Sequence, residues 1–163
     1  MSNKKDEMHG LINKNELNES LKNNPNLIFD QYKLYVEMAN DISNRRENAN
    51  KFYLTLISTI LGINLGILKI VGKNLFLIFP ILFCTILCFL WIFHVNEYNK
   101  LNEGKFKIIN YIENFLPFKG FTIEWELIKP EYTEISSKEK LIPKIIILFS
   151  ILLIIYLIYD FLK

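Results

Sequence analysis

Three long stretches of this sequence lack any charged side chain. Asp, Glu, Lys and Arg are all missing from 52–68, 74–96 and 145–159, although 22% of the 163 residues are charged. A soluble fold of this size could not bury three such runs, because small domains leave much of their surface exposed to water. The sequence therefore excludes an ordinary soluble domain and predicts membrane segments.

Cysteine and histidine are also scarce. Both cysteines, Cys84 and Cys88, fall in the second uncharged stretch, so no disulfide framework is implied. A metal site would need more ligands and a polar surrounding shell, so we interpret the pair as buried apolar residues and expect no metal or cofactor. The first 26 residues are polar and do not resemble a cleaved signal peptide.

The uncharged stretches have the lengths of bilayer-crossing helices. A bilayer core needs about 20 helical residues, which predicts spans at 52–70 and 75–93. The stretch 143–162 is a third span or a membrane-associated helix, with Lys144, Asp160 and Lys163 reaching the two interfaces. Trp91 and His94 fit an interfacial aromatic belt.

Positive charge predicts the orientation of these spans. Eight Lys and Arg residues precede the first span and eight lie in 95–144, but only Lys69 and Lys73 flank the turn between the first two spans. The positive-inside rule then places the N-terminus and the 95–142 segment in the cytoplasm of a bacterial inner membrane.

The remaining sequence predicts a mainly α membrane protein with two or three transmembrane helices. After a mobile polar segment at 1–26, apolar residues at helical spacing predict one helix from about Leu27 to Ile70, so that a cytoplasmic stalk at 27–51 continues into the first span. The second span is expected to extend to a break near Gly104, followed by a small amphipathic helix. Strict alternation in FTIEWEL predicts a strand, and a β-hairpin-like segment over 121–135.

Small residues recur on one face of the first span. Thr55, Thr59, Gly62 and Gly66 follow 3-4 spacing, and small residues allow helices to approach closely. The stripe either packs against the second span of the same chain or forms a subunit contact or water-facing lining in a homo-oligomer. Asn64 belongs to a different face and is expected to bond to a neighbouring helix.

Charged residues outside the spans have two interpretations each. Arg45, Arg46 and Lys51 either contact anionic headgroups or form a ring of charge at the cytoplasmic mouth of an assembly. Glu124 and Glu126 flank Trp125 on the predicted strand, either as a solvated face or as a cytoplasmic contact between subunits. No nucleophile or phosphate-binding loop accompanies these carboxylates, so no catalytic residue is assigned and the chain is not expected to be an enzyme.

Three stretches resemble the RipA family of octameric bacterial membrane proteins: YKLYVEMANDISNRRENANKFYLTL (32–56), LNEGKFKIINYIENFLPFKGFTIEWE (101–126) and EKLIP (139–143). The resemblance implies an eightfold ring with a cytoplasmic part. It also implies similarity to the pore-forming accessory membrane protein of type VI CRISPR systems, whose relatives carry an Arg-x4-His nuclease-like motif. Here Asn50 follows Arg45 and Lys51 follows Arg46 at that spacing. This departure argues against a ribonuclease role, and no nucleic-acid partner is expected.

Two functional hypotheses follow. The first is a non-enzymatic ring or pore that permeabilises the membrane in antiphage defence or stress, with the bilayer and copies of itself as partners. The alternative is a membrane scaffold or adaptor that recruits an unidentified cytoplasmic protein without conducting. A two-span effector coupled to a nucleotide second messenger is a third possibility.

Overall fold

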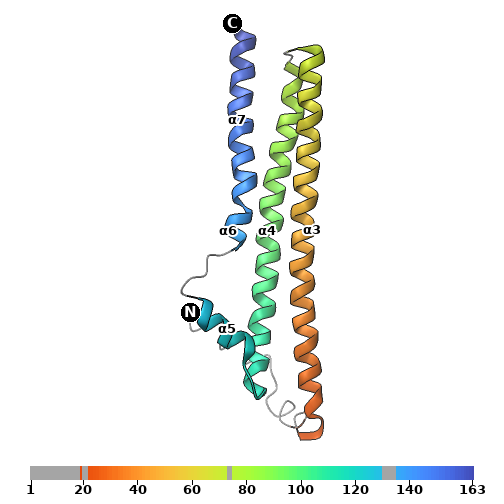
Figure 1. Ribbon diagram of the computed structural model, residues 1–163, viewed down its shortest axis with the longest axis vertical. Helices are drawn as coiled ribbons and strands as arrows, with labels where there is room; N and C mark the ends of the chain where they lie inside the picture. The colour runs from red at the N-terminus through yellow and green to blue at the C-terminus, as the bar shows by residue number, and fades with distance from the viewer. Residues whose placement is uncertain (1–18, 20–21, 73–74, 130–134) are drawn as a thin grey trace. The chain divides into compact units, whose positions relative to one another are not determined.

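The structure is a computed structural model that describes residues 19, 22–72, 75–129 and 135–163, and over these ranges the chain is helical, without a strand (Figure 1). The long helices are α3 (Pro25–Val71), α4 (Ile78–Ile112) and α7 (Leu141–Leu162). The short elements are the 3-10 turns η1 (Leu75–Leu77) and η2 (Glu113–Phe115) and the helices α5 (Gly120–Ile128) and α6 (Ile135–Glu139). Most of the predicted polar segment at 1–26 lies outside the described residues.

Helix α3 is continuous over 47 residues and passes through 44–56, which contain no glycine or proline. At 1.5 Å per residue it is about 70 Å long, roughly twice the thickness of a bilayer core. The helix ends before Gly72, whose φ of 74° is left-handed and whose N–H donates to the Leu68 carbonyl at 3.1 Å. This is a glycine helix cap, and it lets the chain reverse toward α4.

The break expected near Gly104 is wrong, because α4 continues through this glycine to Ile112. One glycine inside a helix costs only about 1 kcal/mol. Buried side chains hold the helix before and after it, including Val95 and Ile109. The expected amphipathic helix is therefore the last part of α4.

The chain divides into two compact units, which we describe separately. One contains the described residues up to Ala39 together with Lys105–Lys129. The other contains Asn40–Gly104 and the described residues from Ile135 onward.

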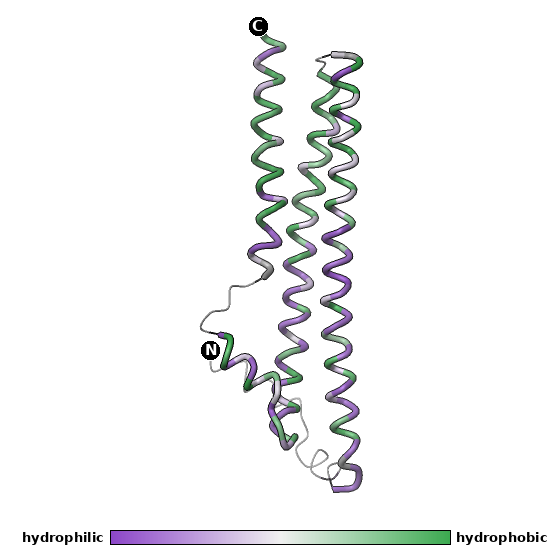
Figure 2. The backbone as a smooth tube through the Cα atoms, viewed as in Figure 1, coloured by the Kyte–Doolittle hydropathy of each residue, from purple (hydrophilic) through white to green (hydrophobic). Residues whose placement is uncertain are grey.

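In the second unit, α7 packs along the apolar parts of α3 and α4. Ile146 and Ile147 adjoin the buried cluster around Ile57 and Cys88, and Leu157 packs with Leu77 and Ile81. Among the described residues, the helices long and apolar enough to cross a membrane are Asn26–Ile70, Leu75–Phe115 and Ser137–Leu162. Figure 2 shows α7 hydrophobic along nearly its whole length, whereas α3 becomes more hydrophobic toward Val71. The third apolar segment therefore has the length and the packing of a span.

In the first unit, the predicted strand at 121–127 is wrong, since these residues form α5. The carboxylate of Glu113 accepts hydrogen bonds from the N–H groups of Phe121 and Thr122, at 2.8 and 2.9 Å. These are donors of the first helical turn, which otherwise lack partners. Hydrogen bonds to Glu113, which lies outside the segment, therefore stabilise a helix here despite the alternation of apolar and polar residues. The proposed hairpin partner lies mostly in 130–134, outside the described residues, and Ile135 begins α6.

Candidate functional site

A layer of polar side chains joins three helices where their apolar segments meet the polar parts of the chain. We call this layer the polar junction, and its members come from α3, α4 and the α6–α7 connection: Arg46, Asn50, Asn96, Asn99, Glu139 and Lys140. All of them belong to the second unit. Side chains that are expensive to place in a bilayer are here bonded to one another, which suits the boundary between water and lipid.

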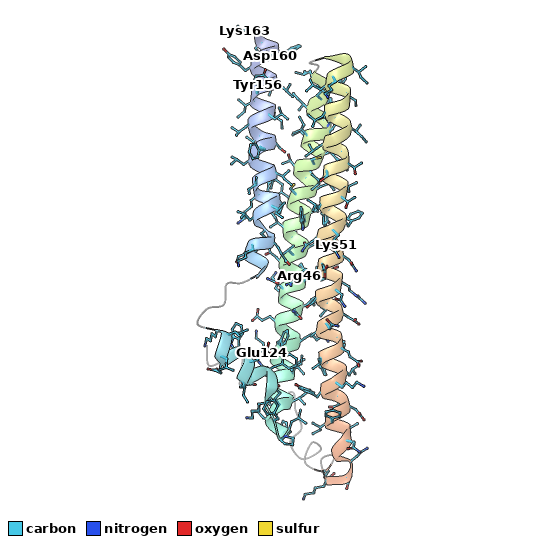
Figure 3. All side chains as sticks on the ribbon, in the orientation of Figure 1. Arg46, Lys51, Glu124, Tyr156, Asp160 and Lys163 are labelled. Atoms are coloured by element: carbon cyan, nitrogen blue, oxygen red, sulfur yellow. The ribbon has the colours of Figure 1, made fainter. Side chains whose placement is uncertain are left out.

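Arg46 is the centre of the polar junction (labelled in Figure 3). Its Nη1 donates to Asn99 Oδ1 at 2.8 Å, and its Nε lies 3.6 Å from Glu139 Oε2. The side chains of Arg46 and Glu139 are only 17% and 21% exposed. Breaking a fully buried ion pair costs about 3–5 kcal/mol, and we assign about 2 kcal/mol to this partly buried one.

The start of α7 is fixed at the same layer. Lys140 Nζ donates to Asn96 Oδ1 at 3.1 Å, one residue after the ion pair that Glu139 makes. The apolar segment of α7 therefore begins at the level where the apolar part of α4 ends. This placement supports a third span that begins on the same side of the membrane as the first.

Aromatic residues extend the polar junction into the apolar region. Trp91 Nε1 donates to Asn50 Oδ1 at 2.6 Å, and the Trp91 ring stacks on Tyr53 at a centroid distance of 5.9 Å. The Tyr53 hydroxyl bonds His94 Nδ1 at 2.6 Å. Because Trp91 is only 2% exposed, its ring packs inside the subunit, and its position in an interfacial belt stays a prediction.

Adjacent arginines on α3 face different surroundings. Arg45 is exposed, whereas Arg46 enters the polar junction. Lys51 is also exposed and pairs with Glu47 at 2.6 Å. Arg45 and Lys51 remain candidates for juxtamembrane contacts, but the side chain of Arg46 is committed to its own chain.

The predicted small-residue stripe lies on the exposed side of α3. Thr55, Thr59, Gly62 and Gly66 are all exposed, and no atom lies within 4 Å of the position that a Cβ on either glycine would occupy. The stripe therefore does not pack against the second span of its own chain, which removes the first of its two interpretations. Asn64 lies about half a turn away and donates to the Leu77 carbonyl at 3.3 Å, so its predicted bond to a neighbouring element is confirmed.

The predicted cytoplasmic contact residues lie on α5. Since Glu124 and Glu126 are two apart on a helix, they point about 200° from each other and do not share the face that a strand would give them. Trp125 is 42% exposed and Leu127 is 76% exposed. Trp125 and Leu127 are also two apart, so the helix exposes apolar side chains on two different sides.

Glu113 is the buried charge that sequence reasoning missed. It is 0% exposed and, besides the two backbone bonds to α5, it accepts hydrogen bonds from Thr122 Oγ1 at 2.6 Å and from Tyr32 OH at 3.1 Å. Burial acts to raise the pKa of Glu113, but the donors from Thr122, Phe121 and Tyr32 together outweigh it and lower the pKa. Burial, followed by the nearby Glu113 carboxylate, raises the pKa of Tyr32.

A carboxylate with all these donors is suited to holding a fold and not to proton transfer, because its oxygens are bonded and closed to solvent. No local pattern marks Glu113, since its partners come from α3 and from the start of α5. Cys84 and Cys88 are likewise fully buried, in the apolar cluster with Trp91. Among the described residues, no group of histidine, cysteine and carboxylate side chains is arranged to hold a metal.

Apolar helices long enough to cross a bilayer, joined by one polar layer, define an α-helical multi-pass membrane protein. Residues 29–159 match the octameric membrane protein family (8xMP), and the chain belongs to that family. Comparison with curated proteins and with solved structures found no match.

Proposed function

We propose that the protein is the subunit of a homo-oligomeric ring, eightfold as in the family name, that forms a regulated pore in the bacterial inner membrane. The observation that carries the proposal is the outward position of Thr55, Thr59, Gly62 and Gly66. Glycines and hydroxyls on an exposed face of a span favour contact with another helix or with water over contact with lipid.

The other exposed surfaces of the spans differ in chemistry. On α4 they carry large apolar side chains such as Phe79, Phe83 and Phe89, each more than half exposed. Such side chains suit lipid or a closely packed neighbour. Helix α3 also exposes Ile63 and Leu65, so the small-residue stripe, and not the whole helix, differs from these apolar surfaces.

For the orientation we rely on the excess of Lys and Arg before the first span and in 95–144, which under the positive-inside rule favours a cytoplasmic N-terminus and a cytoplasmic first unit. The proposed role of this pore is permeabilisation of the membrane, as a defence or stress effector. A trigger from a cytoplasmic partner would act on the first unit.

Flux through liposomes tests the pore. Purified protein is reconstituted into vesicles loaded with a small fluorescent dye and exposed to lysates of stressed or phage-infected cells. We expect dye release that depends on the protein and on the trigger. Intact vesicles under every condition, with an assembled ring confirmed in the same preparation, would contradict conduction.

The exposed apolar surface of α5 favours a second candidate, an adaptor that recruits a cytoplasmic protein. Leu127 is the most exposed apolar residue of α5 and lies on the same side of the helix as Ile123, whereas Trp125 is exposed on another side. Under this candidate the wild type releases no dye, and Leu127→Glu or Trp125→Ala abolishes signalling in cells while assembly stays at the wild-type level. A ring pore whose trigger does not use α5 would be unaffected by both substitutions.

A further inference from the structure

The second unit presents two outer faces of complementary shape. The outer face of α3 carries charged residues followed by small ones, with the exposed Phe52 and Ile63 beside them: Asp41, Arg45, Thr55, Thr59, Gly62 and Gly66. The outer face of α4 consists of large apolar residues followed by charged ones: Phe79, Phe83, Ile86, Leu90, Glu97 and Lys100.

Both faces are exposed in the single chain. The four apolar residues of the α4 face are between 46% and 67% exposed, and they lie about half a turn from the side of α4 that buries Cys88 and Val95. The α3 face lies about half a turn from the side that buries Tyr53 and Ile57. Each face therefore points away from the helix with which its own helix pairs.

We infer that the outer face of α3 of one copy packs against the outer face of α4 of the next copy around the ring. The inference rests on the ring proposed above and specifies how it is built. A ring of more than two copies needs two different faces on each subunit that fit one another, and a single self-complementary face gives only a dimer.

The two faces are at the same height in the membrane. Within one chain Asn50 bonds Trp91 and Asn64 bonds Leu77, so the α3 segment between them is level with the α4 segment 77–91. Copies related by rotation about the membrane normal keep their heights. Thr59 and Gly62 of one copy are then opposite Phe83 and Phe79 of its neighbour, which places the smallest residues against the largest.

The charges of the two faces also match in the antiparallel direction. On α3 the acid comes first, as Asp41 and then Arg45, and on α4 Glu97 comes before Lys100. Running the helices in opposite directions places Arg45 opposite Glu97 and Asp41 opposite Lys100. Glu97 and Lys100 already contact each other at 2.7 Å, with side chains 44% and 71% exposed, so they are available to a neighbour.

Disulfide crosslinking in native membranes tests this contact. Arg45→Cys and Glu97→Cys are made singly and together, and the membranes are oxidised. We expect the double variant to give a ladder of masses rising by one subunit, because each contact joins two different positions. On a denaturing gel, each single variant and the wild type should run at the mass of one subunit, because Cys84 and Cys88 are fully buried and cannot crosslink.

Charge reversal at Arg45 and Glu97 tests the same contact independently. Arg45→Glu or Glu97→Arg should lower the assembled fraction at low salt several-fold, and the two together should restore it. Dimers from Arg45→Cys alone would show α3 packing on α3 and overturn the inference. A double-cysteine variant that does not crosslink, although its particle in detergent has the size of the ring, would also overturn the inference. A wild-type protein that is monomeric in detergent would instead contradict the ring itself.

Discussion

The two sides of α3 use neighbouring residues for opposite purposes. The inner side bonds its own chain at Tyr32, Arg46, Asn50, Tyr53 and Asn64. On the outer side, Arg45 and Thr55 are exposed, and no atom lies within 4 Å of the position that a Cβ on Gly62 or Gly66 would occupy. The difference shows that polar residues on one membrane helix can have two environments: those on the inner side bond their own subunit, and those on the outer side are exposed.

Removing the Glu113 carboxylate is expected to have the largest effect on stability. Glu113→Ala leaves two N–H groups of α5 and the Tyr32 hydroxyl without their acceptor, and we expect a loss of about 3 kcal/mol, since each hydrogen bond to a charged group contributes about 1.5–3 kcal/mol. Hydrogen exchange of α5 amides measures it. Glu124→Ala, on the exposed part of α5, is the matched control and should leave exchange unchanged.

The paired arginines compare the two sides of α3 directly. Arg46→Ala should lower the free energy of unfolding by about 2 kcal/mol, because Glu139 and Asn99 lose their partner inside the subunit. Arg45→Ala should change it by less than about 0.5 kcal/mol, as is typical of surface positions. Thermal unfolding in detergent under conditions that dissociate the ring measures both. Equal losses would mean that the two residues do not differ in environment.

Removing a single hydroxyl from each side of α3 repeats this comparison with a smaller expected effect. Tyr53→Phe should cost about 1 kcal/mol through the lost bond to His94, a usual value for one hydrogen bond. Thr55→Val, two residues away on the outer side, should leave the unfolding of the separated subunit unchanged. A measurable cost for Thr55→Val in that subunit would place its hydroxyl on the inner side.

Acid should produce the smallest effect. Because the pKa of Glu113 is lower in the fold than its ordinary value of 4.5, the folded state binds fewer protons there than the unfolded state. Its contribution to stability is therefore complete above pH 4.5 and declines as the pH falls through the lowered pKa. Hydrogen exchange of α5 against pH should show this decline. In Glu113→Gln, which does not titrate, that part of the decline should be absent.

The sequence was sufficient for the apolar helices because their signal is local. Uncharged runs of bilayer length and helical periodicity predict α3 and the apolar part of α4, and no intervening glycine or proline interrupts the junction before Phe52. The strand predicted at 121–127 failed because its helical state depends on Glu113, which precedes it by several residues. The alternation of FTIEWEL contains no information about that carboxylate.

The candidate site was less predictable for the same reason. The stripe from Thr55 to Gly66 was visible as a pattern, but the side that it faces depends on where α4 and α7 lie. Arg46 and Arg45 are equivalent in sequence, and only the positions of Asn99 and Glu139 distinguish them. Side-chain partners that are distant in sequence set the roles of these residues.

The mass of the assembly tests the central claim, that the outer side of α3 is a contact between copies. Native mass spectrometry is carried out on the wild type, on Gly62→Leu/Gly66→Leu and on Ile63→Leu as a control. We predict eight times the 19.3 kDa subunit mass for the wild type and the control, and a folded monomer for the double glycine variant. An intact ring in that variant would contradict the account.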